Sequence, residues 1–315
     1  MKISLENIRL TFGSNIVLED LSLNFKSGKI NCLLGRSGSG KTSILRIIAG
    51  VSPIFTGSVF FNGKDVTQFH PKQRNLGWVP QEQLLFPGLD IKANIEYGLV
   101  ARGIAKETRN KRVSEIVKLV GLENLINRSP SRLSGGERQR VALARAIAPE
   151  PLVLLMDEPF SSLDAPERDR LSILFKEIQL ETGITSVHVT HSAREAEMIG
   201  DNIFILSNGN IAQEDTVSEI FYKPKSIEVA RILGINNLVE SGQFEGLEYS
   251  AIIPDKAIQI NKGNFRAIVI SSTREKIHLI LEPKIQLTIQ NKDKAKYVPG
   301  DKINLQLDKE LFYRL

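Results

Sequence analysis

The chain has 315 residues, of which 42% are hydrophobic, and carries a formal net charge of +5. This length suffices for two domains, one of them large. The basic residues are scattered, which is typical of a solvated surface and does not indicate nucleic acid as a partner. The single cysteine, Cys32, excludes an intrachain disulfide framework. No apolar run approaches the ~20 residues of a membrane-spanning helix, so we expect any membrane role to depend on a partner.

Residues 3–30 predict an antiparallel β meander, because apolar and polar residues mostly alternate and a Lys-Ser-Gly-Lys turn follows Phe25. Phe12 precedes Gly13-Ser14-Asn15 at an expected loop tip. An exposed aromatic side chain there can stack on an adenine ring, and a Phe packed into the core at a strand end is the alternative. The residues by themselves leave both interpretations open.

The most informative stretch is 35–43, Gly-Arg-Ser-Gly-Ser-Gly-Lys-Thr-Ser, between an apolar run at 30–34 and an apolar helical pattern at 44–49. Glycines let the backbone turn so that its N–H groups form an anion nest, and a helix starting near Lys41 adds its positive end. Lys41 can reach the β- and γ-phosphates of a nucleotide, and the Thr42 hydroxyl can ligate Mg²⁺. The expected phosphate-binding residues are Gly35, Arg36, Ser37, Gly38, Ser39, Gly40, Lys41, Thr42 and Ser43.

The region after this loop predicts further strands and then helices. Residues 57–63 indicate a strand that runs into a turn, and 75–81 an apolar strand that ends in Gln81. A carboxamide at a strand end near the phosphate loop can ligate Mg²⁺ or hold water, although such a Gln is usually only polar surface. Residues 86–120 predict helices, because apolar residues near their end fall at helical spacing.

A second candidate anion site begins at Leu133-Ser134-Gly135-Gly136-Glu137, which opens a long amphipathic helix. A Ser-Gly-Gly start leaves backbone N–H groups free at a helix N-terminus. An ordinary N-cap is the alternative interpretation.

Paired acids follow the apolar run 152–156, which predicts a buried parallel strand. Asp157 at its end is placed to hold Mg²⁺ through water, and Glu158 to orient or deprotonate an attacking water. The alternative is a helix N-cap before Pro159.

A helix is expected over about 166–181, followed by a strand at 184–190 that ends in His191. His188 and His191 are three residues apart, which places them on opposite faces of a strand and argues against a metal pair. His191 is better interpreted as a γ-phosphate contact. A hairpin is expected at 203–211, and helix at 216–234 with a break at Pro224.

Short alternating strands predict a small β-barrel-like domain from about residue 237. Apolar and polar residues alternate at 285–290 and at 303–308, and turns are expected at 261–264 and 299–301. This region contains no phosphate loop or paired acids.

Together these motifs resemble the ATP-binding subunit of an ABC transporter throughout residues 1–235. The resemblance rests on the 35–43 loop, Leu133-Ser-Gly-Gly-Glu, Asp157-Glu158, Ser162-Leu-Asp164 and the single residues Gln81 and His191. It implies an α/β fold, a P-loop NTPase ABC cassette with an antiparallel β subdomain and a helical subdomain, over residues 1–236. Residues 237–315 are similar to the small all-β oligomer-binding domain, of TOBE type, that regulates some importers.

The resemblance also implies ATP and Mg²⁺ as ligands and a head-to-tail dimer of two copies of the chain. In that dimer Ser134, Gly135, Gly136 and Glu137 contact the ATP of the other copy, and Asp164 links the two sites. The resemblance favours the interpretation of Phe12 as the adenine-stacking residue. The implied catalytic residues are Glu158, His191 and Gln81, and the implied Mg²⁺ ligands are Thr42, Gln81 and Asp157. Arg36 stands where many relatives have proline, and Thr42-Ser43 inverts a common order, without loss of a backbone donor or of the hydroxyl.

The expected role is a peripheral MgATPase on the cytoplasmic face of the plasma membrane that drives import. Its implied partners are membrane permease subunits, which dock a helix near residues 81–97, and indirectly a solute-binding protein. Residues 77–87 and 94–99 are closest to iron(III)-type subunits, so iron(III) or a small inorganic anion is the expected solute. A polyamine or sugar importer, an exporter, a non-transport ABC ATPase and a non-catalytic nucleotide-binding module remain as alternatives.

Overall fold

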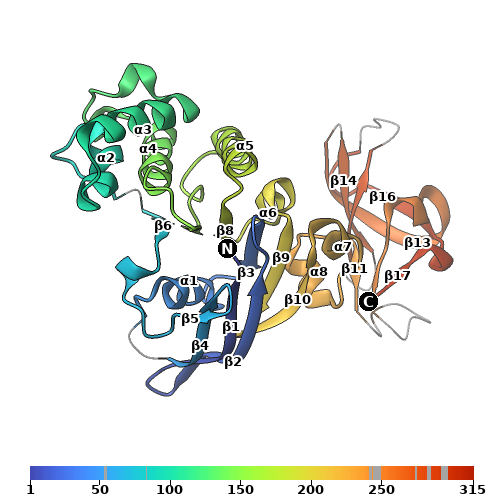
Figure 1. Ribbon diagram of the computed structural model, residues 1–315. Coiled ribbons are helices and arrows are strands. Elements are labelled where there is room, and N and C mark those ends of the chain that lie inside the picture. Colours follow the sequence, from blue (N-terminus) through green and yellow to red (C-terminus); the bar gives the residue numbers. More distant parts are fainter. Residues whose placement is uncertain are drawn as a thin grey trace. The chain divides into compact units, whose positions relative to one another are not determined.

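The computed structural model describes residues 1–52, 55–82, 84–240, 243, 250–273, 275–281, 285–291 and 297–315 (Figure 1). The chain divides into two compact units, Met1–Ile220 and Phe221–Leu315. In the described segments, no helix combines the length and apolar character that crossing a membrane requires.

An antiparallel sheet opens the first unit, with the strand order β2-β1-β4-β5. Phe12 and Asn15 form the closing pair of the β1–β2 hairpin. The meander predicted for residues 3–30 is confirmed for these two strands, but Ile30 already begins a strand of a different sheet. The strands are β1 (Ile3–Phe12), β2 (Asn15–Phe25), β4 (Thr56–Phe61) and β5 (Lys64–Asp65).

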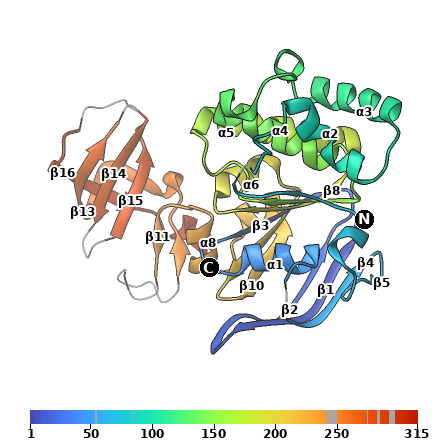
Figure 2. The same ribbon diagram turned by 90° about the vertical axis from the view of Figure 1, so that its left-hand side faces the viewer.

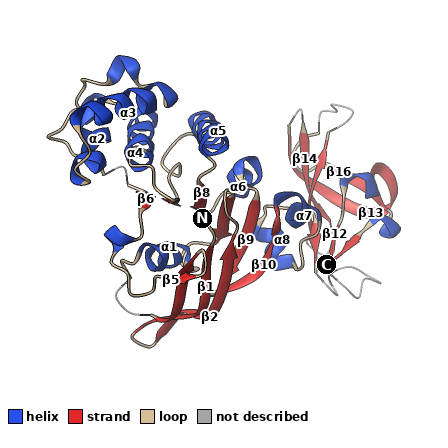
Figure 3. Cartoon of the chain, in the orientation of Figure 1, coloured by secondary structure: helices blue, strands red, loops and turns tan. Residues whose placement is uncertain are grey.

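A second sheet of six strands has the order β10-β9-β3-β8-β7-β6. Figure 3 labels the strands β10, β9, β8 and β6 of this sheet. All neighbours from β9 to β6 pair in parallel, and only β10 is antiparallel to its neighbour. The four strands in the middle of this order are buried at nearly every residue, as expected for parallel strands covered on both faces. The strands are β3 (Ile30–Gly35), β6 (Leu76–Val79), β7 (Val153–Asp157), β8 (Thr185–Thr190), β9 (Asn202–Ser207) and β10 (Asn210–Thr216).

Helix α1 (Lys41–Ala49) packs between the two sheets. Its apolar residues Ile44, Leu45 and Ile48 share one buried cluster with side chains of β1, β2, β3, β7 and β8. On β8 the alternation separates two faces, since Val187 and Val189 belong to this cluster and His188 between them does not. Because α1 starts where the loop after β3 ends, this core fixes the position of the loop.

The helices α2, α3 and α4 gather in one part of the first unit (Figure 2). Asn94, buried at the start of α2, accepts from the Phe86 N–H and donates to the carbonyls of Phe86, Leu89 and Asp90. That network orders the segment between β6 and α2. The remaining helical elements of the unit are α2 (Ile91–Ala101), α3 (Lys106–Leu119), α4 (Gly135–Ile147), α5 (Ala165–Thr182), α6 (Ala193–Ile199) and the 3₁₀ turns Pro71–Gln73, Glu123–Leu125 and Pro130–Arg132; α7 (Val217–Tyr222) leads into the second unit.

The second unit is strand-rich, as the sequence predicts, and contains the sheets β11-β12-β17 and β15-β14-β13-β16. Alternate residues of the longer strands form its buried core, for example Ile277, Leu279 and Leu281. Its elements are α8 (Ile227–Ile232), β11 (Leu238–Val239), β12 (Ala251–Ile252), β13 (Ile258–Ser272), β14 (Lys276–Leu281), β15 (Ile285–Gln290), β16 (Lys302–Leu307), β17 (Tyr313–Arg314) and the 3₁₀ turns Asp255–Ala257 and Lys309–Leu311.

One expectation for this unit is wrong. Residues 261–264 are not a turn between strands but an irregularity within β13, because Ile260 and Phe265 both stand opposite Leu305. Asn261 and Gly263 have φ values of 61° and 76°, which let the extra residues bulge. At Gly263 a Cβ would lie 2.7 Å from Gln306 Cα, so the close approach of β16 requires glycine.

Candidate nucleotide-binding and catalytic site

The predicted site residues meet at the carboxyl edge of the parallel sheet. The 35–43 loop follows β3, Glu158 follows β7 and Gln81 follows β6. A pocket of about 330 Å³ lies here, and we call it the edge pocket. It is lined by Val17, Ser37, Gly38, Gly40, Lys41, Thr42, Ser43, Gln81 and Glu158.

The loop presents groups that suit an anion. Lys41 is 5% exposed, and its Nζ donates to the carbonyls of Gly35 and Arg36 at 2.9 and 2.8 Å. Burial lowers the pKa of the Lys41 ammonium, against the opposing effect of the two nearby carboxylates. The Ser39 hydroxyl is buried and has no hydrogen-bond partner in the part of the chain that the structure describes. A buried ammonium, an unpaired hydroxyl and the N-terminus of α1 together fit a polyphosphate.

Gly40 shows why this loop needs glycine. Its φ of 104° is disfavoured for residues with a side chain, and a Cβ there would lie 2.8 Å from Leu18 Cδ2. The tight approach of β2 to the loop therefore depends on this glycine.

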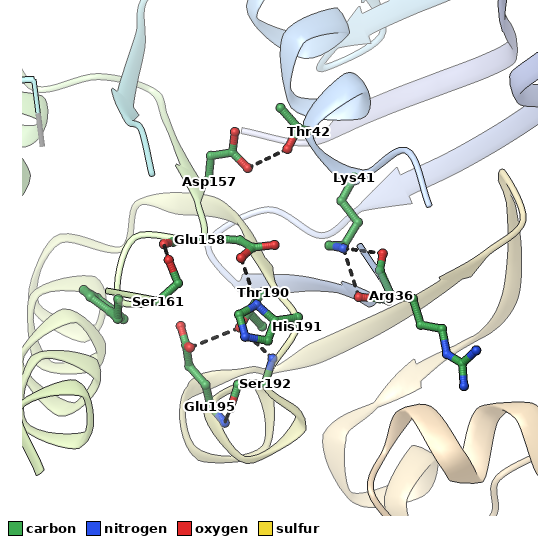
Figure 4. Close-up of polar contacts among 12 residues, drawn as sticks. Arg36, Lys41, Thr42, Asp157, Glu158, Ser161, Thr190, His191, Ser192 and Glu195 are labelled. Carbon is green, nitrogen blue, oxygen red and sulfur yellow. Dashed lines mark hydrogen bonds and ion pairs between the residues drawn. The ribbon is translucent and has the colours of Figure 1, made fainter. Parts of the chain in front are cut away.

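Thr42 and Asp157 bring two oxygen ligands together, since Thr42 Oγ1 donates to Asp157 Oδ1 at 2.9 Å (Figure 4). Asp157 is 8% exposed. Burial raises the pKa of its carboxyl, and the hydrogen bond from Thr42 partly opposes this. With the Gln81 carboxamide at the same pocket, the donor set is a hydroxyl, a carboxylate and an amide oxygen. Hard oxygen donors of this kind fit Mg²⁺.

Glu158 and His191 form a pair, with Nδ1 of the ring 2.8 Å from Oε2 of the carboxylate (Figure 4). The backbone of Glu158 has a φ of 45°, unusual for a residue of this type, and its N–H donates to the Val189 carbonyl on β8. The Ser161 hydroxyl also donates to the Glu158 carbonyl. The side chain of Glu158 lines the edge pocket, and that of His191 is 53% exposed beside it.

The residues of the Leu-Ser-Gly-Gly-Glu motif lie apart from the edge pocket, at the N-terminus of α4. Ser134 and Glu137 form a capping box, in which each side chain accepts the other's backbone N–H. A Cβ at Gly136 would fall 2.0 Å from the Glu167 carboxylate, so this helix start touches the first turn of α5. Asp164 caps α5 by accepting the Glu167 N–H at 2.9 Å. Ser134 is therefore the N-cap of α4, and the start of this helix is also partly exposed.

Phe12 and Val17 are close in the sequence but differ in their relation to the edge pocket. Phe12 is 57% exposed at its hairpin tip and is not among the residues that line the edge pocket, so its adenine-stacking role stays a prediction. Val17 does line the pocket and was not predicted. Its position in an alternating strand offers no signal that separates it from an ordinary core residue.

Comparisons with known proteins agree with this geometry. The family model of the ABC transporter matches residues 18–161. The molybdate/tungstate import ATP-binding protein WtpC of Thermococcus kodakarensis is 43% identical over 229 residues, which are 73% of this chain and 69% of that protein. The Fe(3+) ions import ATP-binding protein FbpC of Fusobacterium nucleatum is 41% identical over 78% of this chain and 66% of its own length.

Among solved structures, the dimeric bacterial ABC transporter cassette MJ0796 matches with a TM-score of 0.61 and 32% identity, over 68% of this chain and 98% of that cassette. A second structure of MJ0796 is a dimeric post-hydrolysis state bound to ADP and Pi. The chain belongs to the family of ABC transporter ATP-binding subunits, which are ATPases.

The capping box at α4 gives a prediction for stability and its dependence on pH. The Ser134 backbone hydrogen bond lowers the pKa of Glu137 from its ordinary value of 4.5. A carboxyl whose pKa is lowered by folding stabilises the fold above its unfolded pKa, and this contribution disappears as the pH falls through the lower, folded value. We expect Glu137→Ala to lower the free energy of unfolding at pH 7 by about 1 kcal/mol, because the exposed hydrogen bond to the Ser134 N–H is lost.

Urea denaturation of wild type and variant between pH 7 and pH values below the ordinary glutamate pKa measures this contribution, and the difference should narrow as the pH falls. Glu137→Gln is the matched control, because its amide oxygen still accepts the Ser134 N–H but does not titrate over this range. A difference between wild type and Glu137→Ala that persists unchanged at low pH would contradict the account.

Proposed function

We propose that this chain is the ATP-hydrolysing subunit of an importer, which dimerises on MgATP and powers a membrane permease. The observation that carries the proposal is the convergence of the 35–43 loop, the Thr42–Asp157 contact and the Glu158–His191 pair at one edge of the sheet. None of these parts is specific by itself, and together they supply each group that phosphoryl transfer to water requires.

The chemistry follows from what each side chain can do. The loop backbone and Lys41 hold the phosphates, and Thr42, Gln81 and Asp157 hold Mg²⁺, which neutralises charge on the β- and γ-phosphates when bound. Glu158 orients the attacking water and accepts its proton. His191 holds the Glu158 carboxylate through Nδ1 and uses its exposed ring edge to contact the γ-phosphate.

The second nucleotide contact comes from another copy of the chain. Ser134, Gly135, Gly136 and Glu137 do not line the chain's own edge pocket, yet Ser134 and Glu137 remain at a partly open helix N-terminus, where an anion is favoured. In the proposed head-to-tail dimer these residues close on the ATP of the other copy. Asp164 is close to that helix start, because its neighbours Leu163 and Glu167 lie against Gly135 and Gly136. It is therefore placed to link the two sites. The dimeric structure of the MJ0796 cassette supports the pairing of two copies.

The permease contact is proposed for the segment after Gln81. Leu84, Phe86, Tyr97 and Val100 are exposed there, and the rings of Phe86 and Tyr97 lie 4.4 Å apart. An apolar, aromatic surface of this kind suits an amphipathic helix of a membrane subunit. Of the segment 81–97, Gln83 lies outside the described residues. The subunit would then act peripherally on the cytoplasmic face of the membrane, with a solute-binding protein on the other side.

The proposed solute is iron(III) or a small inorganic anion. Support comes from the relatives, since FbpC is an iron(III) import protein and WtpC a molybdate/tungstate import protein. No residue of the edge pocket contacts the solute in this scheme, so the sequence of the cassette does not choose between them.

The proposed catalytic role of Glu158 predicts that Glu158→Gln binds ATP as the wild type does and nearly abolishes hydrolysis, since the amide keeps the shape but accepts no proton. The variant should accumulate as an ATP-bound dimer on size-exclusion chromatography. Glu197→Gln, which changes an exposed glutamate in the same way, is the control and should keep wild-type turnover. Wild-type turnover in Glu158→Gln would remove Glu158 from the mechanism.

The proposed solute class can be tested in cells that depend on this protein. Replacing the wild-type gene by the Glu158→Gln form should lower the uptake either of iron or of the anions molybdate, tungstate or sulfate. The uptake of polyamines and sugars should not change. Radiotracer uptake, or elemental analysis of the cells, measures this. Loss of polyamine or sugar uptake with normal uptake of all these ions would contradict the proposed class.

We also propose that residues 1–236 are the nucleotide-binding domain and residues 237–315 a small β regulatory domain. Every residue assigned to ATP chemistry lies before Asn237, and the second unit has its own apolar core. A chain ending at residue 236 should therefore fold and hydrolyse ATP, with altered transport or regulation. ATPase assays over a range of protein concentrations allow for weaker dimerisation. A folded but inactive protein at high concentration would show that the β domain belongs to the catalytic machinery.

A further inference from the structure

A buried hydrogen bond joins His188 and Glu195 close to the Glu158–His191 pair. His188 on β8 is fully buried and Glu195 on α6 is 4% exposed, and Nε2 of the ring lies 2.5 Å from Oε1 of the carboxylate. The other ring nitrogen, Nδ1, has no hydrogen-bond partner among the described residues. A buried hydrogen bond contributes little net free energy to folding, because both groups give up hydrogen bonds to water. A role in fixing local geometry gives this pair a physical reason.

The carboxylate of Glu195 is linked, through the Thr190 hydroxyl, to the residues on both sides of His191. Its second oxygen accepts the Thr190 hydroxyl at 3.1 Å, and the same hydroxyl accepts the Ser192 N–H at 3.0 Å (Figure 4). The Ser192 hydroxyl in turn accepts the Glu195 N–H. The Thr190 hydroxyl, hydrogen-bonded to Glu195, thus connects the residues before and after His191.

The imidazole of His188 also touches the segment that carries Glu158. The centroid of its ring lies 5.8 Å from the ring centroids of both Phe160 and Phe175, and it is stacked on Phe175 with an interplanar angle of 21°. Phe160 is fully buried two residues after Glu158. His188 is therefore in contact with the chain on each side of the Glu158–His191 pair, through Glu195 and Thr190 on one side and through Phe160 on the other.

We propose that His188 and Glu195 are positioning residues, which hold His191 at hydrogen-bond distance from Glu158. The inference rests on the proposed function of that pair. His188 and Glu195 are buried behind the edge pocket and do not line it. Their effect is on the orientation of groups in the hydrolytic step and not on nucleotide binding.

The test compares four variants by steady-state ATPase kinetics and by nucleotide binding. Thr190→Val conserves volume and removes only the hydroxyl, and His188→Phe keeps a ring beside Phe160 and Phe175 while it removes the hydrogen bond. Glu195→Met removes both hydrogen bonds of that side chain. Glu195→Gln is the conservative rescue, because its amide can still pair with both His188 and Thr190.

We expect Thr190→Val, His188→Phe and Glu195→Met to lower kcat by about tenfold or more, as misplaced reacting groups do, with KM and nucleotide affinity within about twofold. Glu195→Gln should retain most of the wild-type kcat. If Glu195→Met does not fold, as judged by circular dichroism, Thr190→Val and His188→Phe still decide the outcome. Unchanged kcat in both folded variants, or equal losses in kcat and affinity, would overturn the inference.

A double-variant cycle separates this inference from the function on which it rests. His191→Ala should itself lower kcat, and adding Thr190→Val to it should have no further effect, because the hydroxyl acts through His191. Losses that multiply in the double variant would overturn the positioning role and leave His191 in the mechanism. Normal turnover of His191→Ala would instead contradict the proposed function of the pair, and the inference would fall with it.

Discussion

The parallel pairing of β3, β8, β7 and β6 is the constraint on which the rest of the site depends. Parallel neighbours end at the same edge of a sheet, so four loops that are far apart in the sequence must meet there. They deliver the phosphate loop, His191, the acids Asp157 and Glu158, and Gln81. A parallel sheet requires cover on both faces, and α1 with the antiparallel sheet supplies one cover while α5 and α6 supply residues for the other.

Burial at this edge shifts the pKa values of basic and acidic side chains in opposite directions. It lowers the pKa of Lys41 and raises that of Asp157, so each ionised form carries a desolvation cost within the chain itself. A phosphate chain beside Lys41 and a divalent cation beside Asp157 bring charges of the compensating sign. The edge pocket is thus electrostatically suited to a metal–nucleotide complex rather than to either component by itself.

The sequence predicts well those features that depend on local spacing. The 35–43 loop, the Leu133–Glu137 helix start and the strand-end acids are all placed where their motifs indicate, because each is a strand–loop–helix or loop–helix unit with its own backbone requirements. The features it does not predict depend on tertiary neighbours. Val17 reaches the pocket because β2 crosses close to Gly40, and residues 261–264 bulge because β16 approaches them.

His188 is another residue whose neighbours the sequence does not predict. Its three-residue offset from His191 argues against a metal pair, but nothing in that spacing reveals that Glu195 and the two phenylalanines are its neighbours. The partners come from α5, α6 and the turn after β7, and only the folded sheet brings them to one place.

The central claim, that the nucleotide is held at the carboxyl edge by the 35–43 loop, is tested most directly by the affinity of Lys41→Ala for a fluorescent ATP analogue. Lys41 has the one ammonium among the residues that line the edge pocket, and loss of a charge-assisted phosphate contact should weaken binding about tenfold or more. Lys72→Ala, which removes an exposed lysine, is the matched control. Titration of both purified variants should show weakened binding for Lys41→Ala alone, and wild-type affinity in that variant would contradict the assignment of the loop as the nucleotide site.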